Sequence, residues 1–226
     1  MSKAILNPKA RDTVIQINTT LQMLVEKGLA IFYNEVRPIN PADQYCQITW
    51  NNHVSGRSNA GGSLLKLEQY MHILKHNSYH CMLFDGSLIR VNFEFENNEL
   101  LTQNLLWWPA PYCYVDLLQE GYAPVDLLLD FYGDPKWHES MIMRSPIRID
   151  FDCKNNTATH PHSHMHIQNG ETRINTENPI CFNKFIEFIF RNFYPDYKIE
   201  FSKHDFINYK IPDMEKIIYN TSTVII

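Results

Sequence analysis

The segment from residue 79 to residue 108 constrains the fold more than any other part of the chain. Residues 88–96 alternate strictly between polar and apolar side chains. The polar set is Arg90, Asn92, Glu94 and Glu96, and the apolar set is Ile89, Val91, Phe93 and Phe95. Because successive side chains of a strand point to opposite faces, this pattern predicts a strand with one apolar and one wet face. Asp85-Gly86 before it and Asn97-Asn98 after it are typical of two-residue hairpin turns. The segment is therefore expected to form an antiparallel meander, with strands at 79–84, 88–96 and 99–108.

Helical patterns flank this meander. Apolar residues recur at helical spacing over 9–27, and Gly28 lies at the position expected for the C-terminal cap of this helix. A second helix is expected at 64–76 with Ser63 as its cap, and two short ones at 112–118 and 125–132. Pro179 is expected to open a last helix that stops before Pro195. With further strands at 29–33 and 44–50, the sequence predicts an α+β fold: an antiparallel sheet built from hairpins and a meander, with packed helices.

The chain length of 226 residues fits one domain. We find no internal repeat and no low-complexity linker, so a single domain over 1–226 is expected. Residues 196–226 are candidates for a peripheral C-terminal appendage, whose end, Val224-Ile225-Ile226, could dock as an edge strand. The loop at 51–62 is rich in Asn, Ser and Gly but matches neither common phosphate-binding pattern, and we interpret it as a connector.

The cysteines and the charge indicate the compartment and limit the partners. The five cysteines are scattered and form no CxxC pair, which is typical of free thiols in a reducing compartment. The first residues lack the apolar core of a signal peptide, and no apolar run approaches the roughly 18 residues of a membrane span. We therefore expect a cytoplasmic location and no membrane. The net charge of −5 gives no global electrostatic case for nucleic acid.

One cluster indicates chemistry. Residues 146–152 and 160–167 are expected to form a second hairpin, and every second residue from 160 to 166 is histidine. Alternate side chains of a strand share a face, so His160, His162, His164 and His166 would line one surface. The preceding strand carries Arg148, Asp150 and Asp152 on one of its own faces. Pairing Asp152 with His160 would place both sets on the same face, whereas a slip of one residue would separate them.

Three interpretations of this cluster remain open. His162, His164 and His166 could hold a divalent metal ion. Alternatively, Asp150, His164, His166 and Arg173 could form a catalytic acid–base site. In that case the remaining polar residues, Arg148, Asp152, His160 and His162, would bind the ligand. Lys184 could add positive charge for phosphate recognition. The third interpretation is a half-exposed surface network with a structural role only.

The same residues resemble a known family. DGSLIRVNFEF, LLWWPAP, IRIDFD, HPHSHMH and NPICFNKFIEFIFRNFYP are together similar to a bacterial family described as domain of unknown function 2290. The resemblance covers residues 65–195. It includes the Asp85-Gly86-Ser87 turn and a closing helix with Phe185, Phe188, Phe193 and Tyr194. Its polar positions are Asp150, His160, Pro161, His164, His166 and Arg173, whereas His162 departs from its pattern. The family has no known activity, so the resemblance implies an intracellular bacterial protein. The His-rich hairpin alone is also similar to some toxin-type ribonucleases.

Three classes of function follow. We rank first a non-catalytic subunit or partner in a defence- or toxin-type operon, because no catalytic signature is complete. The alternatives are a metal- or His/Asp-dependent nuclease or phosphodiesterase, and a small-ligand or nucleotide sensor. The dense aromatic pair Trp107-Trp108 and the apolar end Thr223–Ile226 suggest more apolar surface than one small domain can cover by itself. We therefore expect a homo-oligomer or a complex with another protein chain.

Overall fold

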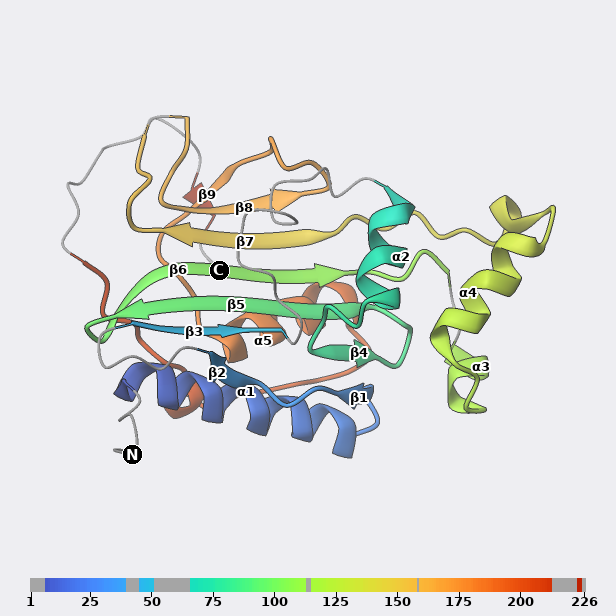
Figure 1. Cartoon of the computed structure of the whole chain (residues 1–226), viewed down its shortest axis with the longest axis horizontal. Helices are drawn as coiled ribbons and strands as arrows, with labels where there is room; N and C mark the ends of the chain where they lie inside the picture. The colour runs from blue at the N-terminus through green and yellow to red at the C-terminus, as the bar shows by residue number, and fades with distance from the viewer. Residues whose placement is uncertain are drawn as a thin grey trace.

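A ten-stranded sheet dominates the computed structural model, which describes residues 7–39, 45–50, 66–112, 115–157, 159–212 and 223–224 (Figure 1). The strands run in the order β1-β4-β5-β6-β7-β8-β9-β10, and the β2–β3 hairpin joins through β3 to β5. The bounds are β1 Ala30–Tyr33, β2 Arg37–Ile39, β3 Tyr45–Thr49, β4 Cys81–Leu83, β5 Leu88–Glu96, β6 Glu99–Trp108, β7 Ile147–Asp152, β8 Ser163–Ile167, β9 Ile174–Thr176 and β10 Thr223–Val224. Every described pair is antiparallel except β9–β10, which is parallel.

The helices confirm the α+β class, and two of their starts differ from the prediction. Their bounds are α1 Pro8–Glu26, α2 Leu67–Lys75, α3 Val115–Gln119, α4 Pro124–Gly133 and α5 Phe182–Phe193, with short 3-10 turns η1 Trp137–Glu139 and η2 Lys203–Asp205. The prediction of Ser63 as the cap of α2 is wrong, because the cap position is Lys66. The loop 51–62 and Ser63 lie outside the described residues.

The start of α5 has a physical reason. The prediction of Pro179 as its first residue is wrong, because the cap position is Cys181. The side-chain amide of Gln103 on β6 accepts a hydrogen bond of 3.2 Å from the Ile180 N–H and donates one to the Ile180 carbonyl. Both backbone groups of Ile180 are therefore used by the sheet and not by the first turn of a helix.

Each turn of the meander has a backbone conformation that suits the residues forming it. Asn97 and Asn98 both have positive φ, 49° and 66°, as a two-residue hairpin turn requires. The Asp85-Gly86 turn is one residue longer than predicted. The last ladder bond joins the Leu83 N–H to the Ser87 carbonyl at 2.8 Å, which leaves residues 84–86 in the loop. Gly86 has φ 85°, a left-handed value that glycine adopts at little cost.

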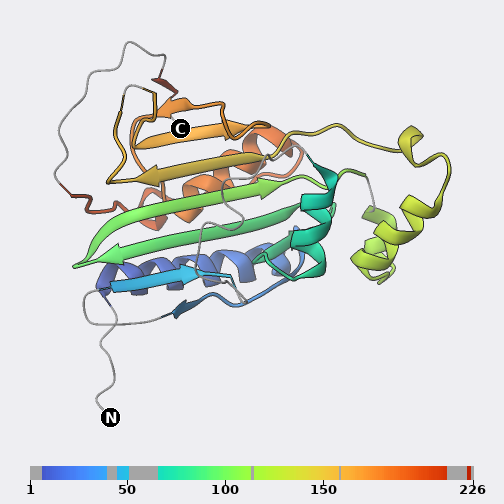
Figure 2. The same ribbon diagram turned by 45° about the horizontal axis from the view of Figure 1, so that its top comes forward.

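One face of the sheet carries the main core. Figure 2 shows α1 and α5 side by side along this face. The apolar residues of the central strands pack here against α1 and α5. They include Ile89, Val91, Phe93, Phe95, Leu105, Trp107, Ile147, Ile149, Phe151 and Met165. The alternation read from the sequence thus places the core as predicted.

The opposite face is not the wet surface that the alternation predicted. At one end α2 covers it, and Leu88, Leu106 and Trp108 pack there in a second apolar cluster that also includes residues of α3 and α4. In Figure 1, α2 crosses in front of β5 and β6, while α3 and α4 project beyond the sheet. Beyond Leu88 and Leu106 the same face becomes polar, and its first polar residues are buried: Arg90 is 3% and Arg148 6% exposed. This buried polar strip is where the predicted site lies.

Two further observations concern the cysteines and the helices. Cys46, Cys81, Cys153 and Cys181 are free thiols, as predicted, and Cys113 lies outside the described residues. Within the part of the chain that the structure describes, none of the helices has the length and apolar content needed to cross a membrane.

Candidate functional site

The pairing of β7 with β8 creates the site. Arg148 lies opposite His166, and Asp150 lies opposite His164. This register differs by two residues from one in which Asp152 pairs with His160. A shift of two keeps the same faces together, so carboxylate and imidazoles do share one face. The shift arises because β8 begins only at Ser163, while His160 forms a separate bridge with Thr157.

The Asp150 carboxylate is the centre of the cluster. It accepts hydrogen bonds from Arg148 Nε at 2.8 Å and from Asn104 Nδ2 at 2.6 Å. Arg148 Nη2 lies 2.7 Å and His166 Nε2 lies 3.1 Å from Asp150 Oδ2. Burial alone would raise the pKa of Asp150. The His166 hydrogen bond and the Arg148 charge outweigh burial and hold the pKa below its usual value. Asp150 is therefore ionised at neutral pH.

His164 is a neutral imidazole with one free nitrogen. Its Nδ1 lies 2.7 Å from the Pro161 carbonyl, which can only accept a hydrogen bond, so Nδ1 carries the proton. The unprotonated Nε2 is buried and has no hydrogen-bond partner. Burial lowers the pKa of His164 to about 4. The ring thus presents a lone pair at neutral pH.

His166 has the complementary arrangement. Its Nε2 faces the Asp150 carboxylate, while its Nδ1 is buried without a hydrogen-bond partner. The ring centroids of His164 and His166 lie 4.7 Å apart, with the ring planes at 79°. Both side chains are almost fully covered, at 1% and 2% exposure, which contradicts the interpretation of the cluster as a half-exposed surface network.

Positive charge surrounds the two rings. Arg148 contacts Asp150 directly, and the buried Arg90 guanidinium lies 4.4 Å from the centre of the Trp50 ring. Burial, together with the charge of Arg148, lowers the pKa of Arg90 to about 10. Continuing the β8–β9 register places Arg173 opposite His166. Arg173 pairs with Glu171 at 3.3 Å, and its buried Nε has no hydrogen-bond partner.

The other predicted residues are arranged less tightly. The His160 ring lies 4.7 Å from the His164 ring and so extends the cluster. The His162 ring stands edge-on to Phe151 at 5.9 Å, away from the Asp150 carboxylate's partners. Asp152 accepts a hydrogen bond of 2.9 Å from the Lys154 N–H, which fixes the turn after β7. The structure therefore does not bring His162 or Asp152 to Asp150.

Comparison with protein-family models gives one result that covers most of the chain. Residues 30–226 match the model described as "Uncharacterized conserved protein (DUF2290)". The chain belongs to the DUF2290 family. Comparison with curated proteins and with solved structures finds no match.

Three residues near the histidine cluster of this DUF2290 chain were not predicted as site residues. Asn104, Arg90 and Trp50 come from β6, β5 and the residue after β3, and all take part in the buried polar strip. Asn104 lies opposite both Asn92 and Asp150, so it continues the polar alternation of β5 across the sheet. Asn104 could have been predicted from the sequence by extending the polar alternation of residues 88–96 to the strands expected beside them.

Asp150, His164 and His166 are also the one candidate metal-binding group among the described residues, with ligand atoms all within 4.8 Å of one another. Asp150 here stands where the sequence predicted His162. Two imidazole lone pairs suit a divalent ion. However, both Asp150 oxygens already accept hydrogen bonds, and the Arg148 guanidinium would lie beside the ion. The donor set therefore fits a metal only in part.

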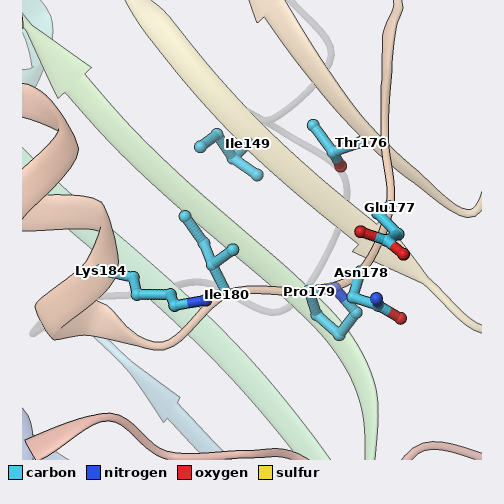
Figure 3. Close-up of a pocket in the computed structure, with 7 residues that line it drawn as sticks. All are labelled: Ile149, Thr176, Glu177, Asn178, Pro179, Ile180 and Lys184. Carbon is cyan, nitrogen blue, oxygen red and sulfur yellow. The ribbon is translucent and has the colours of Figure 1, made fainter. Parts of the chain in front are cut away.

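Lys184 belongs to a different part of the molecule. It lies on α5, on the core side of the sheet, where its Nζ is 5.7 Å from the centre of the Phe206 ring. Figure 3 shows it beside a small pocket of about 120 Å³ with Ile149, Thr176 and Ile180. Because Ile149 points away from the Asp150 face, Lys184 does not contribute charge to the histidine cluster.

Proposed function

We propose that this DUF2290 protein is an enzyme that cleaves phosphoester bonds by acid–base catalysis at Asp150, His164 and His166. The observation that carries the proposal is the pair of buried imidazoles. In each ring an acceptor fixes one nitrogen, and the other nitrogen is buried without a partner. Leaving two such buried ring nitrogens without partners costs free energy, and a bound substrate would satisfy them.

The two histidines suit different roles. His164 would act as the general base that takes a proton from water or a hydroxyl nucleophile, because the Pro161 carbonyl holds its proton on Nδ1 and leaves the Nε2 lone pair free. His166 would act in its imidazolium form, with protons on both ring nitrogens, and give the Nδ1 proton to the leaving oxygen as the bond to phosphorus breaks. Asp150 would orient the His166 ring and stabilise its imidazolium form. Two groups in contrasting environments are a common arrangement for acid–base pairs.

The arginines support an anionic substrate. Arg90 and Arg173 each have a buried Nε–H without a hydrogen-bond partner, and Arg148 lies between them on the same face. Guanidinium groups bind phosphate oxygens through paired N–H donors. The chain's overall charge of −5 does not oppose this, because the positive charge is local.

The test is an assay with bis(p-nitrophenyl) phosphate and with labelled RNA and DNA oligonucleotides, before and after dialysis against EDTA. His164→Asn and His166→Asn should each lower the rate by about 100-fold or more. His72→Asn, on the exposed side of α2, is the matched control and should retain full activity. Undiminished activity in both site variants, or no cleavage of any substrate, would refute the proposal. Activity that EDTA abolishes and Zn²⁺ or Mn²⁺ restores would replace it with the metal-dependent alternative.

A second candidate function, a non-catalytic subunit in a defence- or toxin-type operon, rests on a different observation. Five of the large hydrophobic residues with high exposure lie between residues 117 and 143. They are Leu117, Tyr122, Leu129, Ile142 and Met143, and they belong to the region around α3 and α4 that projects beyond the sheet (Figure 2). Such exposed apolar side chains are typical of a protein interface. A toxin, nuclease or helicase gene beside this one would favour this role, and unrelated neighbours would oppose it.

A further inference from the structure

A cleft of about 470 Å³ lies between α2, the end of β6 and the segment that returns to β7. Aromatic and sulfur-containing side chains make up much of its wall, including Tyr70, Trp108, Trp137 and Met143. Lys66, Arg144 and Gln168 supply polar groups. This volume lies within the range of about 300–1,000 Å³ typical of small-molecule sites.

The cleft adjoins the histidine cluster. Gln168 and Pro146, both in its wall, are joined by a hydrogen bond of 3.0 Å from the Gln168 N–H to the Pro146 carbonyl. This pair continues the β7–β8 ladder two residues beyond Arg148 and His166. Two strand residues span about 7 Å, which is close to the separation of a phosphate from its base in a nucleotide-sized ligand.

The chemistry of the wall limits the occupant. The described residues of the wall include no carboxylate and two cations, Lys66 and Arg144, of which Arg144 is ion-paired with Asp85 at 2.6 Å. A flat, apolar ligand with a negative group therefore fits better than a cation or a neutral sugar. Gln168 adds an amide next to the aromatic side chains. Its φ of 64° is unusual for a residue other than glycine, and such backbone strain concentrates at functional sites.

We propose that this cleft holds the base of a nucleotide whose phosphate lies at His164 and His166. The inference rests on the proposed function and names its substrate class. Trp137 and Trp108 would contact the base through their ring faces or edges, and the Gln168 amide would bond to its polar edge. The arginines around the histidines would bind the phosphate.

The experiment compares mononucleotides with a ligand that has the phosphate and sugar but no base. Isothermal titration calorimetry is run with AMP, GMP, CMP and UMP and with ribose 5-phosphate. We expect at least one nucleotide to bind about tenfold or more tightly than ribose 5-phosphate. Trp137→Leu and Gln168→Ala should each remove this preference, while Tyr122→Leu, exposed on the projecting region, should keep it. Equal affinity for all five ligands, or an unchanged preference in both cleft variants, would overturn the inference.

The two proposals fail in different ways. Binding is also measured with the His166→Asn variant, whose loss of catalysis should leave the base preference in place. A base preference without any phosphoester cleavage by the unmodified protein would refute the enzyme and leave the cleft as a nucleotide-sensing site. Cleavage of bis(p-nitrophenyl) phosphate without a base preference would refute only the cleft.

Discussion

The hydroxyl of Tyr194, just after α5, donates a hydrogen bond of 3.0 Å to the carboxylate of Asp85 in the β4–β5 turn. Both groups are buried, and Arg144 Nη1 lies 2.6 Å from the same carboxylate. Tyr194→Phe keeps the ring but removes the donor. We expect a loss of about 1.5–3 kcal/mol in the free energy of unfolding, measured by urea denaturation. Tyr197→Phe, at a more exposed tyrosine, is the control and should change stability little. Equal effects of the two substitutions would show that this hydrogen bond stabilises little.

Arg148→Met should destabilise the fold strongly, because it leaves the buried Asp150 carboxylate without its guanidinium partner. Removing one partner of a buried ion pair costs about 3–5 kcal/mol. The matched control is Arg191→Met, which breaks the exposed ion pair with Glu187 on α5. That change should cost about 1 kcal/mol or less. A melting temperature of Arg148→Met close to that of the control variant would contradict the central role of Asp150.

His80 should make stability depend on pH. Burial lowers its pKa to about 4 from 6.5, so the unfolded chain binds the proton more readily than the folded one. Its contribution is complete above about pH 6.5 and is lost as the pH falls towards 4, amounting to about 3 kcal/mol. His80→Asn should flatten the dependence of the unfolding free energy between pH 6.5 and 4.5, whereas the exposed His204→Asn should not. Parallel pH curves for the unmodified protein and His80→Asn would disprove this assignment.

All five cysteines should be free thiols. Cys46, Cys81 and Cys181 are buried, and Cys153 is partly exposed. Alkylation of the denatured protein without reductant should modify five residues, as measured by mass spectrometry. In the folded protein, Cys153 should react before the three buried thiols, because they are shielded from the reagent. A disulfide present in stoichiometric amount would contradict both expectations.

We predict that the projecting region mediates association, with another protein or with a second copy of the chain. For self-association, light scattering should show a mass above the 26.6 kDa monomer. Met143, at 92% exposure, is the most exposed of the large hydrophobic residues described. Met143→Glu should therefore weaken the assembly, and Ile15→Glu on α1 should leave it intact. A monomer at every concentration would exclude the homo-oligomer.

Local patterns predicted most of the fold because they depend on neighbouring residues. The strands at 88–96 and 99–108 are where the alternation placed them, and Asn97-Asn98 forms the expected two-residue turn. The short strand β2 was missed, since its middle residue is Pro38, which removes a backbone donor and weakens any strand pattern. The start of α5 was misplaced because Gln103, 77 residues away in sequence, holds Ile180.

The sequence identified the polar residues of the β7–β8 hairpin but not their surroundings. Parity along β7 and β8 left two registers open, and the structure has one that places Asp150 on the same face as His164 and His166. Whether that face is wet depends on elements distant in sequence, so the burial of the cluster could not be read from the hairpin. The prediction of exposed apolar surface at Trp107-Trp108 is wrong for the same reason. Both residues are buried, one on each face of the sheet, and at 1% and 7% exposure they supply little of the exposed surface that the sequence suggested.

The anchoring of α5 has a consequence for native-state hydrogen exchange. Gln103 fixes the residue before its first turn, and Tyr194 fixes its last turn to the β4–β5 loop. A helix held at both ends cannot open without breaking contacts to the central strands. The amides of α5 should therefore exchange together with those of β5 and β6, through one cooperative opening. The helices α3 and α4, which project from the sheet, should exchange earlier and on their own.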